Sequence, residues 1–186
     1  GGVDDPTPFN NSAIKLAKRI TNIVDNNDGS FAVSYELVAL NTGTSALNSL
    51  DLDDAPSAEL LAATTTASAV VANAGTIGVY PELLTDGILA AGESITVAYM
   101  LTVQPSLAAD PTALENSATI TALDANAVSV SDVSDNGADP VGNNGEDTEA
   151  DATPLRASKL NLAKEIASVI DNGDGSYDVS YSLRGQ

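Results

Sequence analysis

Two stretches of the chain are copies of each other: LAKRITNIVDNNDGSFAVSYEL at residues 16–37 and LAKEIASVIDNGDGSYDVSYSL at residues 162–183. Thirteen of the 22 aligned positions are identical, at an offset of 146 residues. The match continues upstream in three more pairs, which are Asp5 and Asp151, Thr7 and Thr153, and Pro8 and Pro154. A period of this length suits an independently folding domain better than a solenoid repeat.

Each copy carries the pattern of a half-buried β-strand. Apolar side chains alternate with polar ones at Phe31, Val33, Tyr35 and Leu37, and again at Tyr177, Val179, Tyr181 and Leu183. The pattern recurs over residues 95–103 and 118–122, and Asn, Asp and Gly residues separate the runs. We therefore predict an all-β fold, an immunoglobulin-like antiparallel β-sandwich of seven to nine strands in tandem repeat.

The copies also suggest where the modules begin and end. We expect an inter-module linker at residues 1–12, one sandwich module at 13–139, an acidic Gly/Asn/Asp-rich linker at 140–158, and the first two strands of the next module at 159–186. Within the module, residues 58–72 fit either a helix or a strand, and the Thr64–Thr66 run favours a strand. A short helical turn near residues 81–84 is a further expectation.

Composition excludes several classes of function. Twenty-six acidic and seven basic residues give a formal charge of −19, which repels nucleic acids and anionic membrane surfaces. The chain has no cysteine and no histidine, so it lacks thiolate chemistry and the commonest general base. No apolar run approaches the roughly 20 residues that span a bilayer. We therefore expect a protein that is not an enzyme, with no nucleic-acid partner and no membrane insertion.

Several short motifs point to a known family. They are Leu16-Ala17-Lys18, the turn Asp-Asn-X-Asp-Gly-Ser-Phe/Tyr, the Val-Ser-Tyr strand, Asn41-Thr42-Gly43, and the string VSDVSDNGADP at residues 130–140. In these motifs the chain resembles the conserved-repeat domains of bacterial cell-surface and adhesin proteins. The resemblance implies an immunoglobulin-like, tandemly repeated, non-enzymatic protein at the extracellular bacterial cell surface. It implies no shared ligand.

The acidic residues raise calcium as a cofactor, because Ca²⁺ takes six to eight oxygen ligands. Candidate ligands lie in the two turns and at the joint between the modules: Asp25, Asp28, Asp132, Asp135, Asp139, Asp147, Asp151, Asp171 and Asp174. The turn at residues 25–29 does not have EF-hand spacing, which favours a plain hairpin turn with Gly29 at positive φ. For the joint, a calcium site and a solvated flexible linker remain alternatives.

Lys18 is an unusual residue for its position, because it shares a strand face with Leu16 and Ile20, and Lys164 repeats this placement. We expect its apolar stem to pack near the sheet edge while the ammonium reaches out to a carboxylate. The alternative is an intramolecular isopeptide bond to an asparagine, for which Asn116 is one candidate. The acidic cluster of Asp51, Asp53 and Asp54 is interpreted as a strand end rather than a site.

These features favour a structural role. We expect a rigid spacer module in an extended adhesin, with calcium stiffening the joints and neighbouring modules of the same protein as partners. One alternative is a subunit of a self-assembling extracellular filament or surface layer, in which other copies of the chain bind by strand donation. Another is a module that binds a glycan or a protein directly, which the small number of aromatic residues disfavours.

Overall fold

The structure is a computed structural model that describes residues 11–141, 151–156 and 162–185. The chain divides into two compact units, residues 1–156 and 157–186. The described part is mostly β-strand, as the alternating patterns predict, with one short α-helix and one 3₁₀ turn. No helix in the described ranges is long and apolar enough to cross a membrane.

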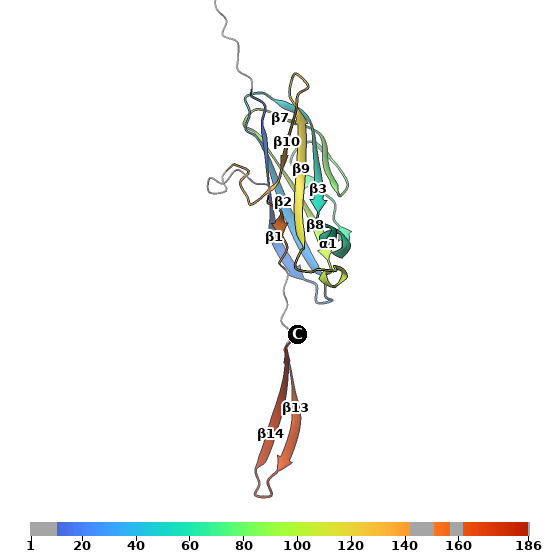
Figure 1. The fold of residues 1–186 in the computed structure, drawn as a ribbon, viewed down its shortest axis with the longest axis vertical. Helices are drawn as coiled ribbons and strands as arrows, with labels where there is room; N and C mark the ends of the chain where they lie inside the picture. The colour runs from blue at the N-terminus through green and yellow to red at the C-terminus, as the bar shows by residue number, and fades with distance from the viewer. Residues whose placement is uncertain (1–10, 142–150, 157–161, 186) are drawn as a thin grey trace, which may run out of the picture. The chain divides into compact units, whose positions relative to one another are not determined.

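The first sheet of the first unit has the order β11-β1-β2-β8-β4, with β5 also pairing with β8. Figure 1 labels its three long strands, β1, β2 and β8. Neighbouring strands in this sheet are antiparallel, except for β1 and β11, which run parallel to each other. The strands are β1 (Ile14–Asp25), β2 (Phe31–Asn41), β4 (Thr64–Ala67), β5 (Val71–Ala72), β8 (Ser94–Val103) and β11 (Asp135–Asn136).

The second sheet has the order β10-β9-β3-β7-β6, with β12 also pairing with β9, and all its pairs are antiparallel. Its strands are β3 (Leu47–Pro56), β6 (Thr76–Ile77), β7 (Glu82–Leu89), β9 (Glu115–Leu123), β10 (Ser129–Val133) and β12 (Thr153–Pro154). Seven strands of the first unit have five residues or more, and the others are short segments at the edges.

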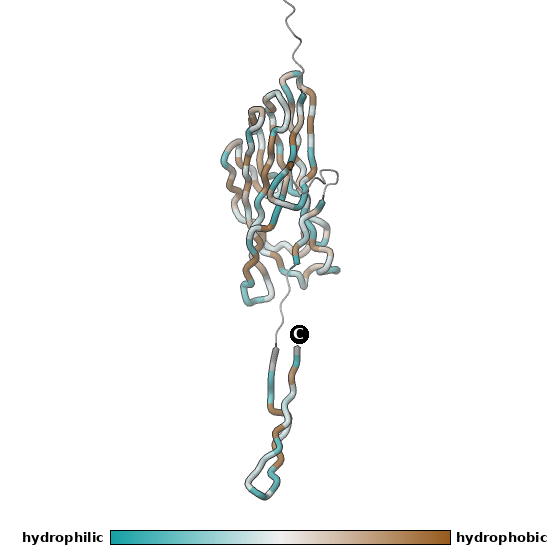
Figure 2. Tube along the Cα trace, turned by 90° about the vertical axis from the view of Figure 1, so that its left-hand side faces the viewer, coloured by the Kyte–Doolittle hydropathy of each residue, from teal (hydrophilic) through white to brown (hydrophobic). Residues whose placement is uncertain are grey.

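One apolar core lies between these two sheets. Along β2 every second residue from Phe31 to Asn41 is buried, and β8 and β9 show the same alternation. The period of two in the sequence therefore becomes one inward face and one outward face on each strand. Figure 2 shows hydrophobic segments along the strands and hydrophilic residues in several turns.

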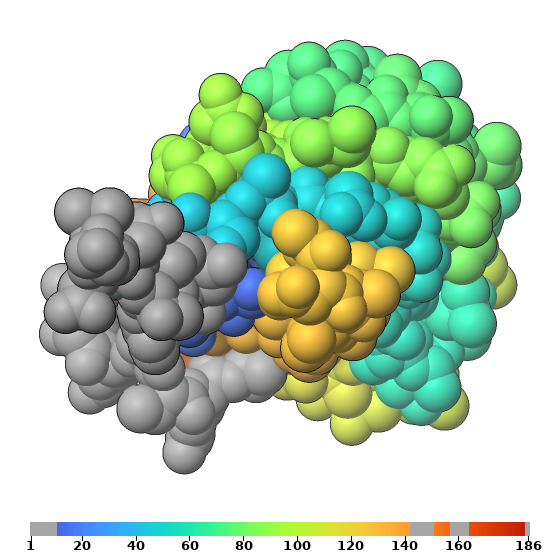
Figure 3. All heavy atoms as spheres, turned by 90° about the horizontal axis from the view of Figure 1, so that it is seen from above, coloured from blue at the N-terminus to red at the C-terminus, as the bar shows by residue number. Residues whose placement is uncertain are grey.

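At one end of this unit the turn between β9 and β10 lies beside the loop between β2 and β3 (Figure 3). Ser12 Oγ donates to Asp124 Oδ2 at 2.8 Å there. In the β2–β3 loop, a Cβ on Gly43 would lie 2.4 Å from the backbone oxygen of Asn11. The glycine of the Asn41-Thr42-Gly43 motif thus permits a close approach of two backbone segments.

Residues 58–72, which fit either a helix or a strand, contain both in succession. The segment begins with helix α1 (Ala58–Ala63), which Ser57 Oγ caps by accepting from the backbone N–H of Leu60 at 3.1 Å. The strand prediction holds only for β4 and β5, which follow. The helical turn expected at residues 81–84 is also wrong, since β7 begins at Glu82. The 3₁₀ turn η1 (Pro105–Leu107) lies after β8 instead.

The first unit extends beyond the boundary expected from the sequence. Residues 153–155 were expected in the linker 140–158, but Thr153 and Pro154 pair with β9 as strand β12, and Leu155 follows them. Thr153 is 2% exposed and Leu155 is 4% exposed. The backbone N–H of Leu155 donates to the carbonyl of Leu114 at 2.7 Å. These residues are therefore part of the sandwich, because they close one side of its core.

The second unit is the hairpin of β13 (Leu162–Asp171) and β14 (Tyr177–Gly185). It repeats the register of β1 and β2: Ile166 pairs with Tyr181 as Ile20 pairs with Tyr35. The irregularity after Ile20 in β1 also recurs, after Ile166 in β13. The sequence copies thus specify the same local structure down to the same bulge.

We predict that the Leu155→Ala variant loses about 2–4 kcal/mol of unfolding free energy, because it removes a buried side chain and leaves a cavity. Urea denaturation followed by circular dichroism measures this loss. Val141→Ala is the matched control, because Val141 is 47% exposed and its truncation should cost little. Equal effects of the two substitutions would show that β12 does not belong to the core.

Candidate functional site

Three polar side chains occupy inward positions where the alternation of their strands otherwise places apolar ones. Lys18 follows Ile14 and Leu16 on β1, Asp54 follows Leu50 and Leu52 on β3, and Asn116 precedes Ala118 and Ile120 on β9. Lys18 and Asn116 are 0% exposed, and Asp54 is 6% exposed. Because β1 belongs to one sheet and β3 and β9 to the other, the three residues meet across the core. We call them the Lys18 cluster.

Asp54 connects the members of the Lys18 cluster. Its Oδ1 accepts hydrogen bonds from Lys18 Nζ and from Tyr99 Oη, the latter at 2.7 Å. Its Oδ2 accepts from Asn116 Nδ2 at 3.2 Å. Lys18 Nζ also donates to the backbone carbonyl of Ser117 at 2.8 Å. One carboxylate thus contacts both the amine and the amide.

The amide of Asn116 is only partly satisfied. Its Nδ2 donates to Asp54 and also to Tyr99 Oη, at 3.1 Å, but its Oδ1 is buried and accepts no hydrogen bond. Strand β12 covers this part of the core: Thr153 pairs with Asn116, and Thr153 Oγ1 donates to the Lys18 carbonyl at 3.0 Å. Strand β12, which the sequence analysis placed in a linker, therefore covers the Lys18 cluster.

Three tyrosine rings pack beside the cluster. Tyr35 and Tyr99 stack with centroids 5.3 Å apart, and Tyr80 is tilted against Tyr99 at 5.7 Å. Lys18 Nζ lies 5.1 Å from the Tyr35 centroid and 5.8 Å from the Tyr99 centroid, within range of cation–π attraction. Burial, and to a smaller extent the charge of Asp54, raises the pKa of Tyr99 well above its usual range. The tyrosines therefore remain neutral hydroxyls at physiological pH.

Burial also changes Lys18. Loss of hydration lowers its pKa to about 8, although the charge of Asp54 and the hydrogen bond to it act in the opposite direction. The expected position near the sheet edge is wrong, because the whole Lys18 side chain is buried in the core. The expected carboxylate partner is present, and it is Asp54, from the cluster interpreted as a strand end. The pattern that could have identified it is the inward alternation of Leu50, Leu52 and Asp54.

The candidate calcium ligands of the two hairpin turns bind their own backbone. Asp25 Oδ1 accepts from the N–H of Asn27 at 2.7 Å, and Asp28 Oδ1 accepts from that of Ser30 at 2.9 Å. In the second unit, Asp171 and Asp174 make the equivalent bonds to Gly173 and Ser176. Gly29 has φ of +91°, as the turn requires. These contacts support the hairpin interpretation of both turns.

The candidates at the end of the first unit lie in different places. Asp132, on β10, accepts from the backbone N–H of Leu16 at 2.7 Å, and Asp135 pairs with Ala17 in β11. Asp139 accepts from the N–H of Val141 at 2.9 Å. Asp151 is exposed, and Asp147 lies outside the described residues. Over residues 11–141, 151–156 and 162–185, the structure contains no group of three or more acidic side chains placed to hold a metal ion.

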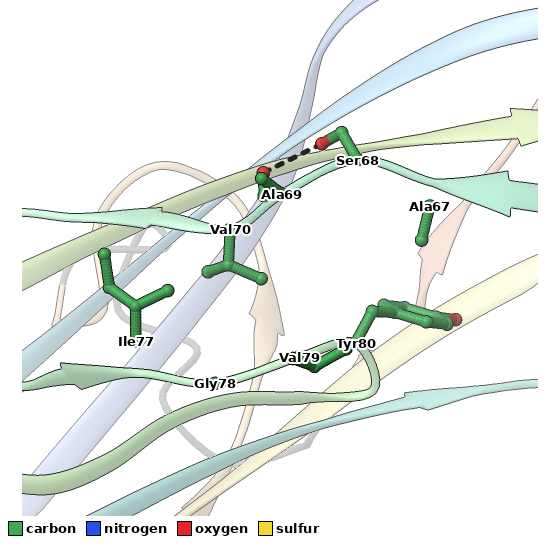
Figure 4. Close-up of a pocket in the computed structure, with 8 residues that line it drawn as sticks. All are labelled: Ala67, Ser68, Ala69, Val70, Ile77, Gly78, Val79 and Tyr80. Atoms are coloured by element: carbon green, nitrogen blue, oxygen red, sulfur yellow. Dashed lines mark hydrogen bonds between the residues drawn. The ribbon is translucent and has the colours of Figure 1, made fainter.

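A hollow of about 300 Å³ lies on the surface between the β4–β5 segment and the loop before β7. Figure 4 shows Val70 and Ile77 beside it and Tyr80 at one end. Its remaining lining residues are small or apolar apart from Ser68, and none is charged. The polar side chains of this lining are the hydroxyls of Ser68 and Tyr80.

No protein-family model matches the chain, and no curated protein is significantly similar to it in sequence. Among solved structures, the chain is similar to the crystal structure of a FixG-related protein from Vibrio parahaemolyticus. The identity is 13% and the TM-score 0.33, and the alignment covers 66% of this chain and 95% of the other.

We predict that the Asp54→Asn variant loses about 3–5 kcal/mol of unfolding free energy, because it leaves the buried Lys18 ammonium without a counter-charge. Urea denaturation at pH 7 measures the loss. Glu36→Gln is the control, since it removes the partner of Arg19 in a pair that is largely exposed and should cost at most about 1 kcal/mol. Similar costs for the two variants would mean that Lys18 is not held in the core by Asp54.

Proposed function

We propose that the chain is a non-catalytic structural part of an extended bacterial surface protein, built from immunoglobulin-like modules in tandem. Each module acts as a rigid spacer that holds a binding domain elsewhere in the parent protein away from the cell. The motifs that resemble the conserved-repeat domains of adhesins support this assignment, as does the repeat of 146 residues.

One observation carries the tandem proposal. The β13–β14 hairpin repeats β1–β2 in sequence and register, yet its inward residues are uncovered. Tyr35 and Leu37 are 1% and 0% exposed, whereas their counterparts Tyr181 and Leu183 are 53% and 62% exposed. Two strands alone are marginally stable in water. We infer that further strands of the same kind cover this hairpin when the second module is whole.

The same exposed face supports the second candidate function, a subunit of a self-assembling filament or surface layer. Strands of another copy could cover the hairpin by β-strand addition, which joins chains in a head-to-tail series. The net charge of −19 opposes this assembly, because copies repel one another. We therefore place the spacer first.

We expect this chain to sediment as a monomer at every concentration tested, and its hairpin amides at residues 162–185 to exchange hydrogen quickly. Amides of β2 and β8, which pair inside the first unit, should exchange slowly and serve as the internal reference. Sedimentation velocity and hydrogen-exchange mass spectrometry measure the two properties. If the chain instead assembles as its concentration rises and the hairpin amides are protected from exchange, the filament subunit becomes the better proposal and the spacer is rejected.

Calcium at the module joints is a separate part of the proposal, supported by the number of carboxylates there and by their charge. We expect the melting temperature in millimolar calcium to exceed that in EDTA by several degrees at constant ionic strength. Ligand at a hundred times its dissociation constant stabilises by roughly 2.7 kcal/mol per site.

Magnesium and added sodium chloride are the controls for ionic strength. A double substitution of Asp139 and Asp151 by Asn should abolish the calcium-specific rise, whereas Asp110→Asn, outside the candidate set, should preserve it. If calcium, magnesium and sodium chloride raise the melting temperature equally, the acidic joint binds no specific ion. It is then a solvated linker, and the spacer is flexible at its joints.

A further inference from the structure

In the Lys18 cluster a buried amide oxygen accepts no hydrogen bond, and two neighbouring tyrosine hydroxyls are poorly satisfied. Across the part of the chain that the structure describes, Asn116 Oδ1 is buried and accepts no hydrogen bond, and the buried hydroxyls of Tyr35 and Tyr80 make only loose contacts, with Asn116 and Asp54 respectively. Asn116 belongs to the cluster, and the two tyrosines pack around it. Native cores rarely leave such atoms unpaired, because each has lost its hydration without compensation. The unsatisfied Asn116 oxygen therefore calls for a physical explanation.

We propose that Lys18 and Asn116 become joined by an intramolecular amide bond between Nζ of the lysine and Cγ of the asparagine, with Asp54 as the proton-transfer group. The geometry supports each role. Asp54 contacts Lys18 Nζ through Oδ1 and Asn116 Nδ2 through Oδ2. Lys18 Nζ also donates to the carbonyl of Ser117, the residue next to Asn116.

The reaction needs no oxidant, reductant or other reagent. The Lys18 ammonium gives one proton to Asp54, and the lone pair of the neutral amine attacks Cγ of Asn116, placing negative charge on Oδ1. Asp54 passes its proton to Nδ2 and takes a second one from Nζ. The Cγ–Nδ2 bond then breaks, Oδ1 regains its double bond, and ammonia leaves. The products are a secondary amide, a neutral Asp54 carboxyl group and one ammonia molecule.

The surroundings favour this chemistry. With its pKa lowered to about 8, a substantial fraction of Lys18 is the neutral amine, which is the nucleophilic form. Folding holds amine and amide against one carboxylate, so an otherwise very slow reaction becomes intramolecular. Strand β12 and the tyrosines exclude bulk water, which would compete as a nucleophile. The Tyr35 hydroxyl interacts with the Asn116 amide and can donate to the charge that develops on Oδ1.

The second copy of the motif provides a natural control. Lys164 corresponds to Lys18 in sequence and lies 4.1 Å from the Tyr181 ring centroid, as Lys18 lies over Tyr35. Lys164 is exposed on the hairpin, however, with hydrated surroundings and no buried carboxylate against it. We therefore expect one bond per chain, formed by Lys18 and not by Lys164.

The test is the intact mass of the folded, purified chain under denaturing conditions. We expect the mass calculated from the sequence less one ammonia molecule, and after proteolysis a branched peptide in which Lys18 is linked to Asn116. The variants Lys18→Arg, Asn116→Ala and Asp54→Ala should each have the full mass calculated from their sequences. Lys164→Arg is the matched control and should keep the deficit.

Other results would overturn the bond. The full calculated mass of the folded wild-type chain would do so by itself, whether or not any variant folds. A deficit of one water molecule would mean that a lysine amine has been acylated by a carboxyl group, for which Asp54 is the candidate, and not by the amide of Asn116. An ammonia deficit that survives in Lys18→Arg would indicate a succinimide, for which Asn136-Gly137 and Asn172-Gly173 are suitable sequences. Circular dichroism establishes which variants are folded.

Discussion

The first unit depends on the pairing of Lys18 with Asp54 across its core. Transferring an ammonium and a carboxylate out of water costs several kcal/mol for each ion, and attraction offsets this cost only when the remaining hydrogen bonds are made. Here Tyr99, Asn116 and the Ser117 carbonyl make them. A shift of one residue in the register of β1 would turn Lys18 outward and leave Asp54 buried alone. The pair therefore specifies which register of the sheets is stable.

The two copies of the hairpin separate what local sequence determines from what the surrounding fold determines. Both copies form the same turn, pairing and bulge, which depend on residues within about 22 positions of each other. The environment of the lysine differs completely between them, because the partners of Lys18 come from β3 and β9. Hairpin geometry follows from the motif, whereas the chemistry of the lysine needs the whole sandwich.

This division explains how much could be predicted from the sequence. The alternation in β2 and β8 and the Asp-Asn-X-Asp-Gly turn predicted an all-β fold, and the inward phase of Lys18 was also evident. Asp54 was not identified, because its neighbours Asp51 and Asp53 made it look like one of several surface acids. Strand β12 was missed because its pairing is only two residues long and its burial depends on β9, far away in sequence. Residues 58–72 left helix and strand as alternatives, and both form: the Ser57 cap begins helix α1, and the threonines that follow it form β4.

The net charge of the chain bears on the choice between the two proposed functions, spacer and filament subunit. The pairing of Lys18 with Asp54 is electrically neutral, so it leaves the net charge of −19 to the rest of the chain, where only six basic residues remain against the acidic ones. At physiological salt, repulsion between copies extends over a Debye length of about 8 Å. Modules joined in series tolerate this, since a covalent linker holds them together and repulsion only favours extended arrangements. Separate copies docking through the β13–β14 hairpin would have to overcome this repulsion, so their association would strengthen as added salt screens the charge, whereas a covalent series would not need such screening.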